Sequence, residues 1–443
     1  MTCMKCGLRR RFETVVRFPI LVAVCILLVL FMLGPGAIPA DFARNASAAE
    51  ASAAADGRQA SAAAPQRPAD RPASIRALAA RLDIAPGSAV ADIGAGKGMD
   101  TWVFADLVGP TGTVYAEEIT EGNVKTLRAE VEKRKLAQVR PVLGRDDSPN
   151  LPPDSVDLAY MRYVYHHLSK PREMLREIWR SLKPGGHFVV VDRLPGTLRD
   201  WVPREQRASK HFWLAETTVV REAREEGFCF VACADELCES KDNPFVLIFQ
   251  RPEDQAEPGL DPDPLVPLAT GAVSEMLLAA DKRFQRPAIM ALGQARELIP
   301  AILERSSGAG VEIVLEEWAT QKDERPPLPA GILLPSALTD LGIADLGSEP
   351  IDAVFFLDAY HLLFHGPALL NQLHQRLAAG GCVFVLDREA KQALSRREAS
   401  HHRRIAPETV KQELAAAGFV LISESPAPAK DRFLLVFGKA KPE

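Results

Sequence analysis

The sequence has no excess of positive charge and few of the residues that build metal or disulfide sites. Its 443 residues carry a formal net charge of −5, which gives no electrostatic basis for nucleic acid as the main partner. Seven cysteines are scattered along the chain, and the one CxxC, Cys3 to Cys6, has no second CxxC or CxxH to complete a zinc site. We therefore expect no metal and no nucleic acid.

Long hydrophobic runs are also scarce. The exception is residues 18–33, which follow a basic segment and precede Gly34. A basic flank before an apolar run is typical of a secretory signal or a signal anchor. The run is shorter than a span of about 20 residues, and Ala46-Ser47-Ala48 resembles a cleavage site, so both alternatives stay open. We expect a membrane-anchored or exported protein, with the side of the membrane undecided.

Composition divides the rest of the chain into further segments. After the signal or anchor segment (residues 1–34), the Ala-, Ser- and Pro-rich residues 35–73 show no hydrophobic period and are predicted to be a disordered tether. Ordered sequence follows in a first domain (74–251), an acidic, Pro-rich linker (252–266) and a second domain (267–443).

The stretch 88–119 organises the first domain. A short apolar strand ends at Ile93 and leads into Gly94-Ala95-Gly96-Lys97-Gly98, a helical segment, and a second strand that ends in Glu117 and Glu118. Strand, glycine loop, helix, strand and acid form one half-turn of a nucleotide-binding α/β sheet. Strand and helix patterns continue to alternate, which predicts a parallel sheet, and the last two strands predict an antiparallel hairpin at one edge.

The spacing of the glycines restricts what the loop can bind. A phosphate-binding P-loop needs glycine at 91 and Ser or Thr at 98, where this chain has Ala91 and Gly98. A dinucleotide fingerprint needs glycine at 99, where Met99 stands. A simple tight turn remains an alternative. The acid at the end of the next strand favours a nucleoside, because a carboxylate accepts hydrogen bonds from both ribose hydroxyls.

The second domain repeats the first. Residues 156–193 align without gaps on residues 351–388, including Tyr-His, Gly-Gly and Asp-Arg pairs. We match residues 92–98 with Ala291–Glu297, and the two acids 117–118 with Glu316-Glu317. On this match, the second copy keeps one glycine of three, loses Asp92, and has Glu297 where a side chain would crowd a ligand.

With these residues in view, the first domain resembles the class I S-adenosylmethionine-dependent methyltransferases. The resemblance covers about residues 74–251 and depends on DIGAGKG, the acid at the end of the second strand, GRDD, VDLAYMRYVYHHL and LKPGGHFVVVD. It implies a Rossmann-like, seven-stranded sheet for the first domain. Together with the internal repeat and the apolar run, this predicts an α/β fold of two tandem doubly wound domains of this type behind an N-terminal hydrophobic helix. The second would be a degenerate copy.

The resemblance also assigns cofactor-binding roles. The glycines would let the backbone approach the methionine part of S-adenosyl-L-methionine, Asp92 would hold the loop or the cofactor's amino group, and Glu118 would bind ribose. Asp146, or alternatively Asp147, would lie by the adenine. The implied set is Asp92, Gly94, Ala95, Gly96, Gly98, Glu118, Asp146 and Asp147.

Three histidines are candidates for acid–base chemistry. His166 and His167 follow the fourth strand, at the end where open α/β sheets bind ligands, and His211 lies on a predicted helix over residues 204–226. His166 and His211 also have a structural alternative, because Tyr-His recurs as Tyr360-His361 and His211 as His402, whereas His167 is replaced by Leu362 in the second copy.

The leading hypothesis is an enzyme that transfers a methyl group from S-adenosylmethionine to a small-molecule or lipid-like acceptor in its first domain. The second domain would be a non-catalytic partner in an intramolecular pseudo-dimer. The alternative is a non-catalytic envelope binding or scaffold protein with the same fold. An exported body would lie away from a cytoplasmic cofactor, so topology bears on the choice.

Overall fold

The computed structural model describes residues 67–439, apart from 194–213, 215, 240–243, 265, 278–282, 309, 316–332, 339–343, 364–365, 426–428 and 430. The predicted signal or anchor segment, nearly all of the predicted tether, and His211 lie outside the described residues. Among the helices that are described, none has the length and apolar character needed to span a membrane.

The first half of the chain forms a seven-stranded sheet of order β3-β2-β1-β4-β5-β7-β6. Its strands are β1 (Ala89–Ile93), β2 (Thr113–Glu118), β3 (Val139–Leu143), β4 (Val156–Arg162), β5 (Leu182–Arg193), β6 (Cys229–Cys233) and β7 (Pro244–Gln250). β7 runs antiparallel to both of its neighbours, and the other pairings are parallel. The predicted edge hairpin is thus confirmed.

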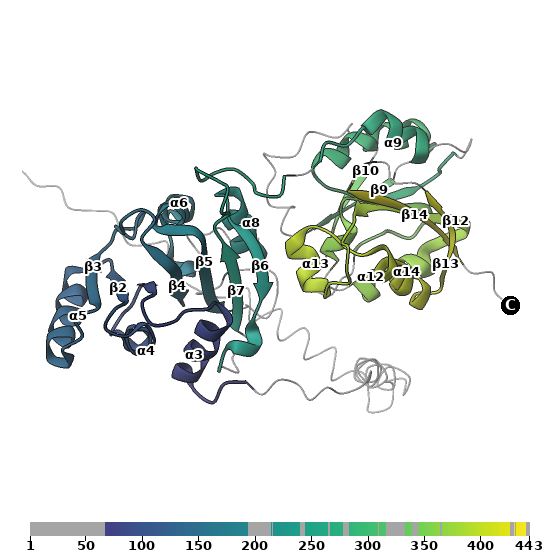
Figure 1. The fold of residues 1–443 in the computed structure, drawn as a ribbon. Helices are drawn as coiled ribbons and strands as arrows, with labels where there is room; N and C mark the ends of the chain where they lie inside the picture. The colour runs from purple at the N-terminus through teal and green to yellow at the C-terminus, as the bar shows by residue number, and fades with distance from the viewer. Residues whose placement is uncertain are drawn as a thin grey trace, which may run out of the picture. The chain divides into compact units, whose positions relative to one another are not determined.

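Helices cover both faces of this sheet. Figure 1 shows α4 and α6 on opposite sides of it, and each side has its own apolar cluster. Four apolar residues of α6, at helical spacing from Met174 to Trp179, are buried on one side. The helices are α3 (Arg71–Arg81), α4 (Met99–Val108), α5 (Glu121–Arg134), α6 (Pro171–Ser181) and α8 (Glu216–Glu225), with 3₁₀ turns η1 (Tyr165–His167) and η3 (Asp235–Leu237).

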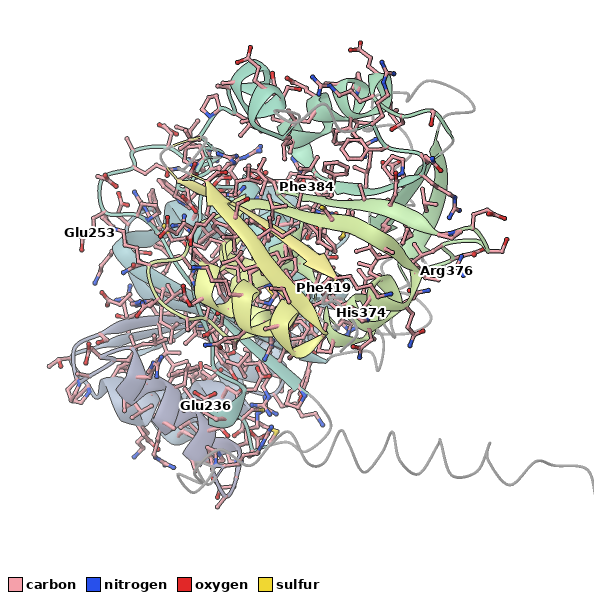
Figure 2. All side chains as sticks on the ribbon, turned by 90° about the vertical axis from the view of Figure 1, so that its right-hand side faces the viewer. Glu236, Glu253, His374, Arg376, Phe384 and Phe419 are labelled. Carbon is pink, nitrogen blue, oxygen red and sulfur yellow. The ribbon has the colours of Figure 1, made fainter. Side chains whose placement is uncertain are left out.

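The second half forms another seven-stranded sheet with the equivalent order, β10-β9-β8-β11-β12-β14-β13. In its core Phe384 stacks on Phe355 with ring centroids 4.7 Å apart, and His374 meets Phe419 edge to face at 5.0 Å. Figure 2 labels Phe384, His374 and Phe419. The strands are β8 (Pro287–Ala291), β9 (Gly310–Leu315), β10 (Leu333–Leu338), β11 (Ile351–Leu357), β12 (Leu377–Arg388), β13 (Phe419–Ser425) and β14 (Arg432–Lys439). The α/β class with two doubly wound sheets is confirmed.

The helices described in the second half are α9 (Thr270–Leu277), α10 (Ile299–Glu304), α12 (Gly366–Arg376), α13 (Arg396–His402) and α14 (Pro407–Ala416), with 3₁₀ segments η4 (Gly293–Leu298) and η5 (Tyr360–Leu362). Helix α10 is shorter than the equivalent α4, and a helical turn stands where the first half has its glycine loop. The long helix predicted over 204–226 is described only as α8 in its last part, because residues 204–213 and 215 lie outside the described residues.

Strand pairing corrects the sequence match between the two glycine segments. Ile93 of β1 lies beside Met161 of β4, and Met290 of β8 lies beside Phe356 of β11. Met161 and Phe356 are equivalent in the gapless match of the two strands, so Ile93 corresponds to Met290. The sequence match, which set Asp92 against Ala291, was two residues out of register.

In the corrected register Gly96 corresponds to Gly293. Two equivalent turn hydrogen bonds agree with this register: the Gly98 N–H donates to the Ala95 carbonyl at 2.8 Å, and the Ala295 N–H donates to the Leu292 carbonyl at 3.1 Å. Ala295, and not Glu297, therefore replaces Gly98. The conclusion that one glycine of three is kept still holds, although the residues that replace the others are different.

The acids after the second strand were also mismatched. Ala91 pairs with Tyr115 in the first sheet, and the equivalent Ala288 pairs with Val311 in the second. Counting three residues onward, Glu118 corresponds to Val314 and not to Glu317. The second sheet therefore has no carboxylate at the register position of Glu118.

Candidate functional site

The glycine loop joins β1 to α4 and is held open by backbone conformations that favour glycine. Gly94, Gly96 and Gly98 have φ of 71°, 58° and 77°, in the left-handed region. A Cβ on Gly94 would lie 2.5 Å from Val164, and one on Gly98 would lie 2.4 Å from the Trp102 ring. A Cβ on Gly96 would have nothing within 4 Å, so the middle of the loop presents bare backbone to open space.

Asp92 is buried directly below the loop. It accepts a hydrogen bond of 2.5 Å from the Thr101 hydroxyl of α4. Burial raises the pKa of Asp92 to about 7, and the neighbouring Asp100 adds to the rise. Because its carboxyl is directed to the helix that follows the loop, this geometry fits the loop-holding alternative of the two roles.

Glu118 connects the end of β2 to the loop. Its carboxylate accepts hydrogen bonds from the Gly96 N–H at 2.7 Å and from the Asn123 side chain at 3.1 Å. The acid and the bare backbone of the loop thus lie within one hydrogen bond of each other, although they are 22 residues apart in sequence. A carboxylate beside an open glycine backbone suits a nucleoside with vicinal hydroxyls.

Glu117 is a site residue that the sequence reasoning missed. It accepts a hydrogen bond of 3.0 Å from the Gly94 N–H, while its Oε1 is buried without a partner among the described residues. Burial raises the pKa of Glu117 to about 8. A Cβ at Gly144 would lie 1.8 Å from that Oε1, so a glycine directly after β3 was the available signal that a side chain fills this space.

The two residues predicted to lie by the adenine are more exposed to solvent than Asp92 and Glu118 are. The Asp146 side chain is 55% exposed and pairs with Lys170 at 3.1 Å, and Asp147 pairs with Arg145 at 3.0 Å. Both lie in the turn after β3, at the same sheet end as the glycine loop, which is where the sequence placed them. Their present partners are surface cations, and no contact joins them to Glu118.

The histidines after β4 have different environments. His166 is buried, and its Nδ1 lies 2.8 Å from Asp192 Oδ1, while its backbone N–H donates to the same carboxylate at 3.2 Å. His167 is exposed, and partial burial together with His166 lowers its pKa. The two rings are adjacent, with centroids 4.1 Å apart. Of the pair, only His167 presents its ring to solvent.

The second sheet lacks the features of this site. Ile289 occupies the register position of Asp92, Ala291 that of Gly94, and Val314 that of Glu118. Glu297 is exposed, so it does not crowd the strand ends as the sequence match suggested. The second sheet differs at this position in another way: the open loop is replaced by η4, whose Arg296 pairs with the buried Glu312 of β9 at 2.5 Å.

No cluster of three or more His, Cys, Asp or Glu side chains suited to a metal ion occurs within the described part of the chain. This observation does not test the expectation that the protein binds no metal. The residues around the loop instead fit S-adenosylmethionine: Gly96 leaves space for a ligand against the backbone, and Glu118 offers a carboxylate beside it.

Comparison with known proteins agrees with the chemistry of this site. Residues 91–190 match the family described as "Methyltransferase domain". A ubiquinone/menaquinone biosynthesis C-methyltransferase from Ectopseudomonas mendocina is 30% identical over 110 residues, which are 25% of this chain and 43% of the relative. A demethylmenaquinone methyltransferase from Geobacillus is 25% identical over 118 residues, 27% of this chain and 50% of the relative.

An arsenite methyltransferase from Halobacterium salinarum is 28% identical over 109 residues, covering 25% of this chain and 28% of the relative. The chain thus spans half or less of the length of these three relatives. Among solved structures, a SAM dependent methyltransferase from Aquifex aeolicus is 23% identical, with a TM-score of 0.35 over 40% of this chain and 88% of that one. The glycine loop, Glu118 and the family match all lie in the first sheet, and this part of the chain is a class I S-adenosylmethionine-dependent methyltransferase domain.

Proposed function

We propose that the protein transfers a methyl group from S-adenosylmethionine to a small, largely apolar organic acceptor, and that the first domain performs the reaction. The observation that carries the proposal is the open backbone at Gly96, hydrogen-bonded to Glu118 at the carboxyl ends of parallel strands. Relatives named for demethylmenaquinone and for ubiquinone/menaquinone biosynthesis support an acceptor of the quinone kind.

The loop and Glu118 would hold the cofactor, and Asp92 would hold the loop. When bound, S-adenosylmethionine supplies a methyl group already activated on a sulfonium. The protein's task is then mainly to align the acceptor and exclude water. Asp146 or Asp147 by the adenine, and His211 on the acceptor side, remain part of this proposal.

We assign the general-base role, where the acceptor must lose a proton, to His167 in preference to His166. The lowered pKa of His167 keeps its ring neutral, and therefore able to accept a proton, near pH 7. His166 Nδ1 is engaged by Asp192, and the same pair recurs in the second sheet, where His361 Nδ1 lies 2.7 Å from Asp387. This repetition supports a positioning role for His166.

The second domain would act as a non-catalytic partner of the first in a pseudo-dimer. Arg397 of α13 pairs with Glu216 of α8 at 2.5 Å, and also with Asp235 at 2.5 Å. The ring of Phe230 in β6 lies 5.0 Å from that of His401. These contacts support an association in which α13 covers the β6 edge of the first sheet.

Calorimetric titration of the full chain with S-adenosylmethionine tests the cofactor assignment. We expect one site per chain, with affinity lost by about tenfold or more in Glu118→Gln, since a charge-assisted hydrogen bond is replaced by a weaker one. Glu132→Gln, an exposed change on α5, is the matched control and should bind like the parent. A folded protein that binds no cofactor would favour the envelope binding or scaffold function.

Methyl transfer is tested separately with methyl-labelled cofactor and a demethylated quinone as the acceptor. Label in the quinone fraction supports the quinone-like assignment. Label in another fraction of a cell extract would support the methyltransferase activity and would show that the acceptor is not a quinone. His167→Asn should lower the rate of methyl transfer. It should also remove the decrease in rate at acid pH that protonation of a general base causes, while cofactor affinity stays unchanged.

We further propose that residues 1–34 attach the protein to a membrane with its domains on the cytoplasmic side, where the cofactor is made. The basic flank and apolar run support attachment, and the need for S-adenosylmethionine supports the side. A reporter fused after Ala48, active only in one compartment, and fractionation of the full chain test the two parts. Reporter activity outside the cytoplasm would contradict the orientation.

A further inference from the structure

A cavity of about 310 Å³ lies at the carboxyl ends of the second sheet, a volume within the range of small-molecule sites. Leu292 and Gly293 after β8 line it, together with Asp358 after β11 and Arg388 at the end of β12. Ligands of open α/β sheets bind at this end. The position corresponds to that of the cofactor loop in the first domain, but the wall is chemically different.

Helix α8 of the first domain closes the other side of the cavity, through Val220 and Arg224 among others. A molecule in this space therefore touches both halves of the chain. Val220 and Leu292 offer an apolar surface, and Arg224 offers a guanidinium. The combination suits a ligand that has an apolar body and one charged end.

Arg224 differs from Arg388 and Arg403, which also line the cavity, in having no carboxylate partner among the described residues. Arg388 pairs with Asp263 at 3.0 Å, and Arg403 pairs with Asp261 at 3.0 Å. For Arg224, the structure records one hydrogen bond, from its Nη2 to the His401 carbonyl at 2.6 Å. Of its five N–H groups, most are therefore left to water or to a ligand.

The surroundings make this unpaired cation costly. Burial lowers the pKa of Arg224 to about 10, and the nearby Arg403 and Arg388 add to the decrease. A guanidinium that has lost part of its hydration without gaining a carboxylate is destabilising. One bound carboxylate would satisfy it with two parallel hydrogen bonds.

The acids of the cavity are already engaged, so they do not supply that carboxylate. Asp358 is bound by Arg432 at 2.9 Å, Asp261 by Arg403 at 3.0 Å, and Glu225 by Arg172. A bound carboxylate would therefore supply the counter-charge that Arg224 lacks among the described residues. S-adenosylmethionine is a poor match, because Val314 stands at the register position of the carboxylate that would take its ribose.

We propose that this cavity is a second ligand site, which binds a monocarboxylate with an apolar chain through Arg224. The site lies outside the methyltransferase domain's own loop and does not depend on methyl transfer. Because α8 and the second sheet both line it, its occupant joins the two halves of the chain. Its binding is expected to raise the stability of the whole chain and not of one domain alone.

The probe is octanoate, and octanamide is its neutral counterpart of nearly equal shape. In calorimetric titrations of the full chain, we expect octanoate to bind about tenfold or more tightly than octanamide, because a charge-assisted pair replaces a neutral hydrogen bond. Arg224→Met should reduce octanoate binding to the level of octanamide. Arg224→Lys should restore part of the difference, since it keeps the charge and loses the fork.

Arg128→Met, which removes an exposed arginine of α5, is the control and should retain the full difference. S-adenosylmethionine titrations on the same variants should be unchanged, so this proposal and the proposed function fail separately. Equal binding of octanoate and octanamide would overturn the proposal, as would no octanoate binding, or a difference that survives Arg224→Met. Competition between octanoate and S-adenosylmethionine would assign the cavity to the cofactor instead.

Discussion

The two sheets of this chain share a set of buried contacts and differ in the loop that follows the first strand. In both, a tyrosine hydroxyl donates to a glutamate at 2.8 Å, Tyr165 to Glu222 and Tyr360 to Glu413. In both, the next histidine binds an aspartate at the end of the fifth strand. That loop is open at Gly96 in the first sheet and is helical from Gly293 in the second.

This difference separates scaffold from ligand chemistry within one molecule. A buried contact that is present in both sheets does not require the open loop, which is found in the first sheet and not in the second. We therefore propose that His166 belongs with the scaffold, despite its position at the ligand end of the sheet. Glu118, Gly94 and Gly98 are replaced by other residue types in the second sheet, and they are where cofactor binding should be sought.

The largest effect is expected when the open loop is filled. Gly96→Val should lower affinity for S-adenosylmethionine by about 100-fold, or ~3 kcal/mol, because the new side chain projects into the space a ligand needs. Gly293→Val is the matched variant, since its φ of 50° is close to the 58° of Gly96 and the strain is similar. Calorimetry should find cofactor affinity unchanged in Gly293→Val; a similar loss in both would break the comparison.

Removing the shared aspartates should destabilise both domains alike. Asp192→Asn and Asp387→Asn each weaken a buried carboxylate–imidazole pair, at a cost of about 2–3 kcal/mol. Hydrogen exchange, followed separately in peptides of β4 and β11, measures the opening free energy of each sheet. A stability loss confined to one sheet, or a loss of activity in Asp192→Asn beyond the loss of folded protein, would return His166 to the catalytic group.

The first domain should lose stability as pH rises from 6 to 8. Glu117 and Asp92 have folded-state pKa values raised by burial, to about 8 and about 7. The folded state therefore holds protons that the unfolded state has released, and stability falls as pH rises through this window. We expect a loss of about 3–4 kcal/mol from pH 6 to pH 8, the larger part of it from Glu117.

Hydrogen exchange in β1 and β2, measured across this pH range, checks how steeply the free energy of unfolding falls as pH rises. Glu117→Gln should make this fall shallower, because the amide remains neutral at every pH. The exposed Glu132→Gln should leave it as steep as in the parent. A rise in stability between pH 6 and pH 8 would contradict the assignment of a protonated Glu117.

The smallest effects are expected from the paired tyrosines. Tyr165→Phe and Tyr360→Phe each remove one hydroxyl bonded to a glutamate, with an expected cost of about 1 kcal/mol in the affected sheet. Thermal unfolding with peptide-resolved exchange compares the two. Cofactor affinity should be unchanged in both, and a loss in Tyr165→Phe alone would indicate that this tyrosine reaches the ligand.

The sequence was sufficient to predict the sheet, because local patterns encode it. Apolar strands alternating with helices indicate the order of elements, as do glycines such as Gly185 and Gly380, both with φ of 78°, near the irregular starts of β5 and β12. The class of cofactor was implied by the family resemblance, which depends on short local motifs such as the DIGAGKG segment. These features need no knowledge of contacts between distant residues.

Register and side-chain direction could not be obtained in this way. A match of two short loops can shift by two residues without changing its hydrophobic pattern, and only pairing with β4 and β11 placed Gly293 against Gly96. Glu117 and Glu118 are likewise adjacent in sequence. Which of them faces Gly94, and which faces Gly96, depends on how β2 lies beside β1.

The linker has a consequence for how the two halves behave in solution. The Gly259 N–H donates to the Glu226 carbonyl of the first domain at 3.1 Å, and two residues later Asp261 pairs with Arg403 of the second. Only Leu260 is left between these anchors. Each half therefore experiences the other at an effective concentration above the millimolar range typical of short flexible linkers. Contacts between the halves that are too weak to hold two separate molecules together would still form within one chain.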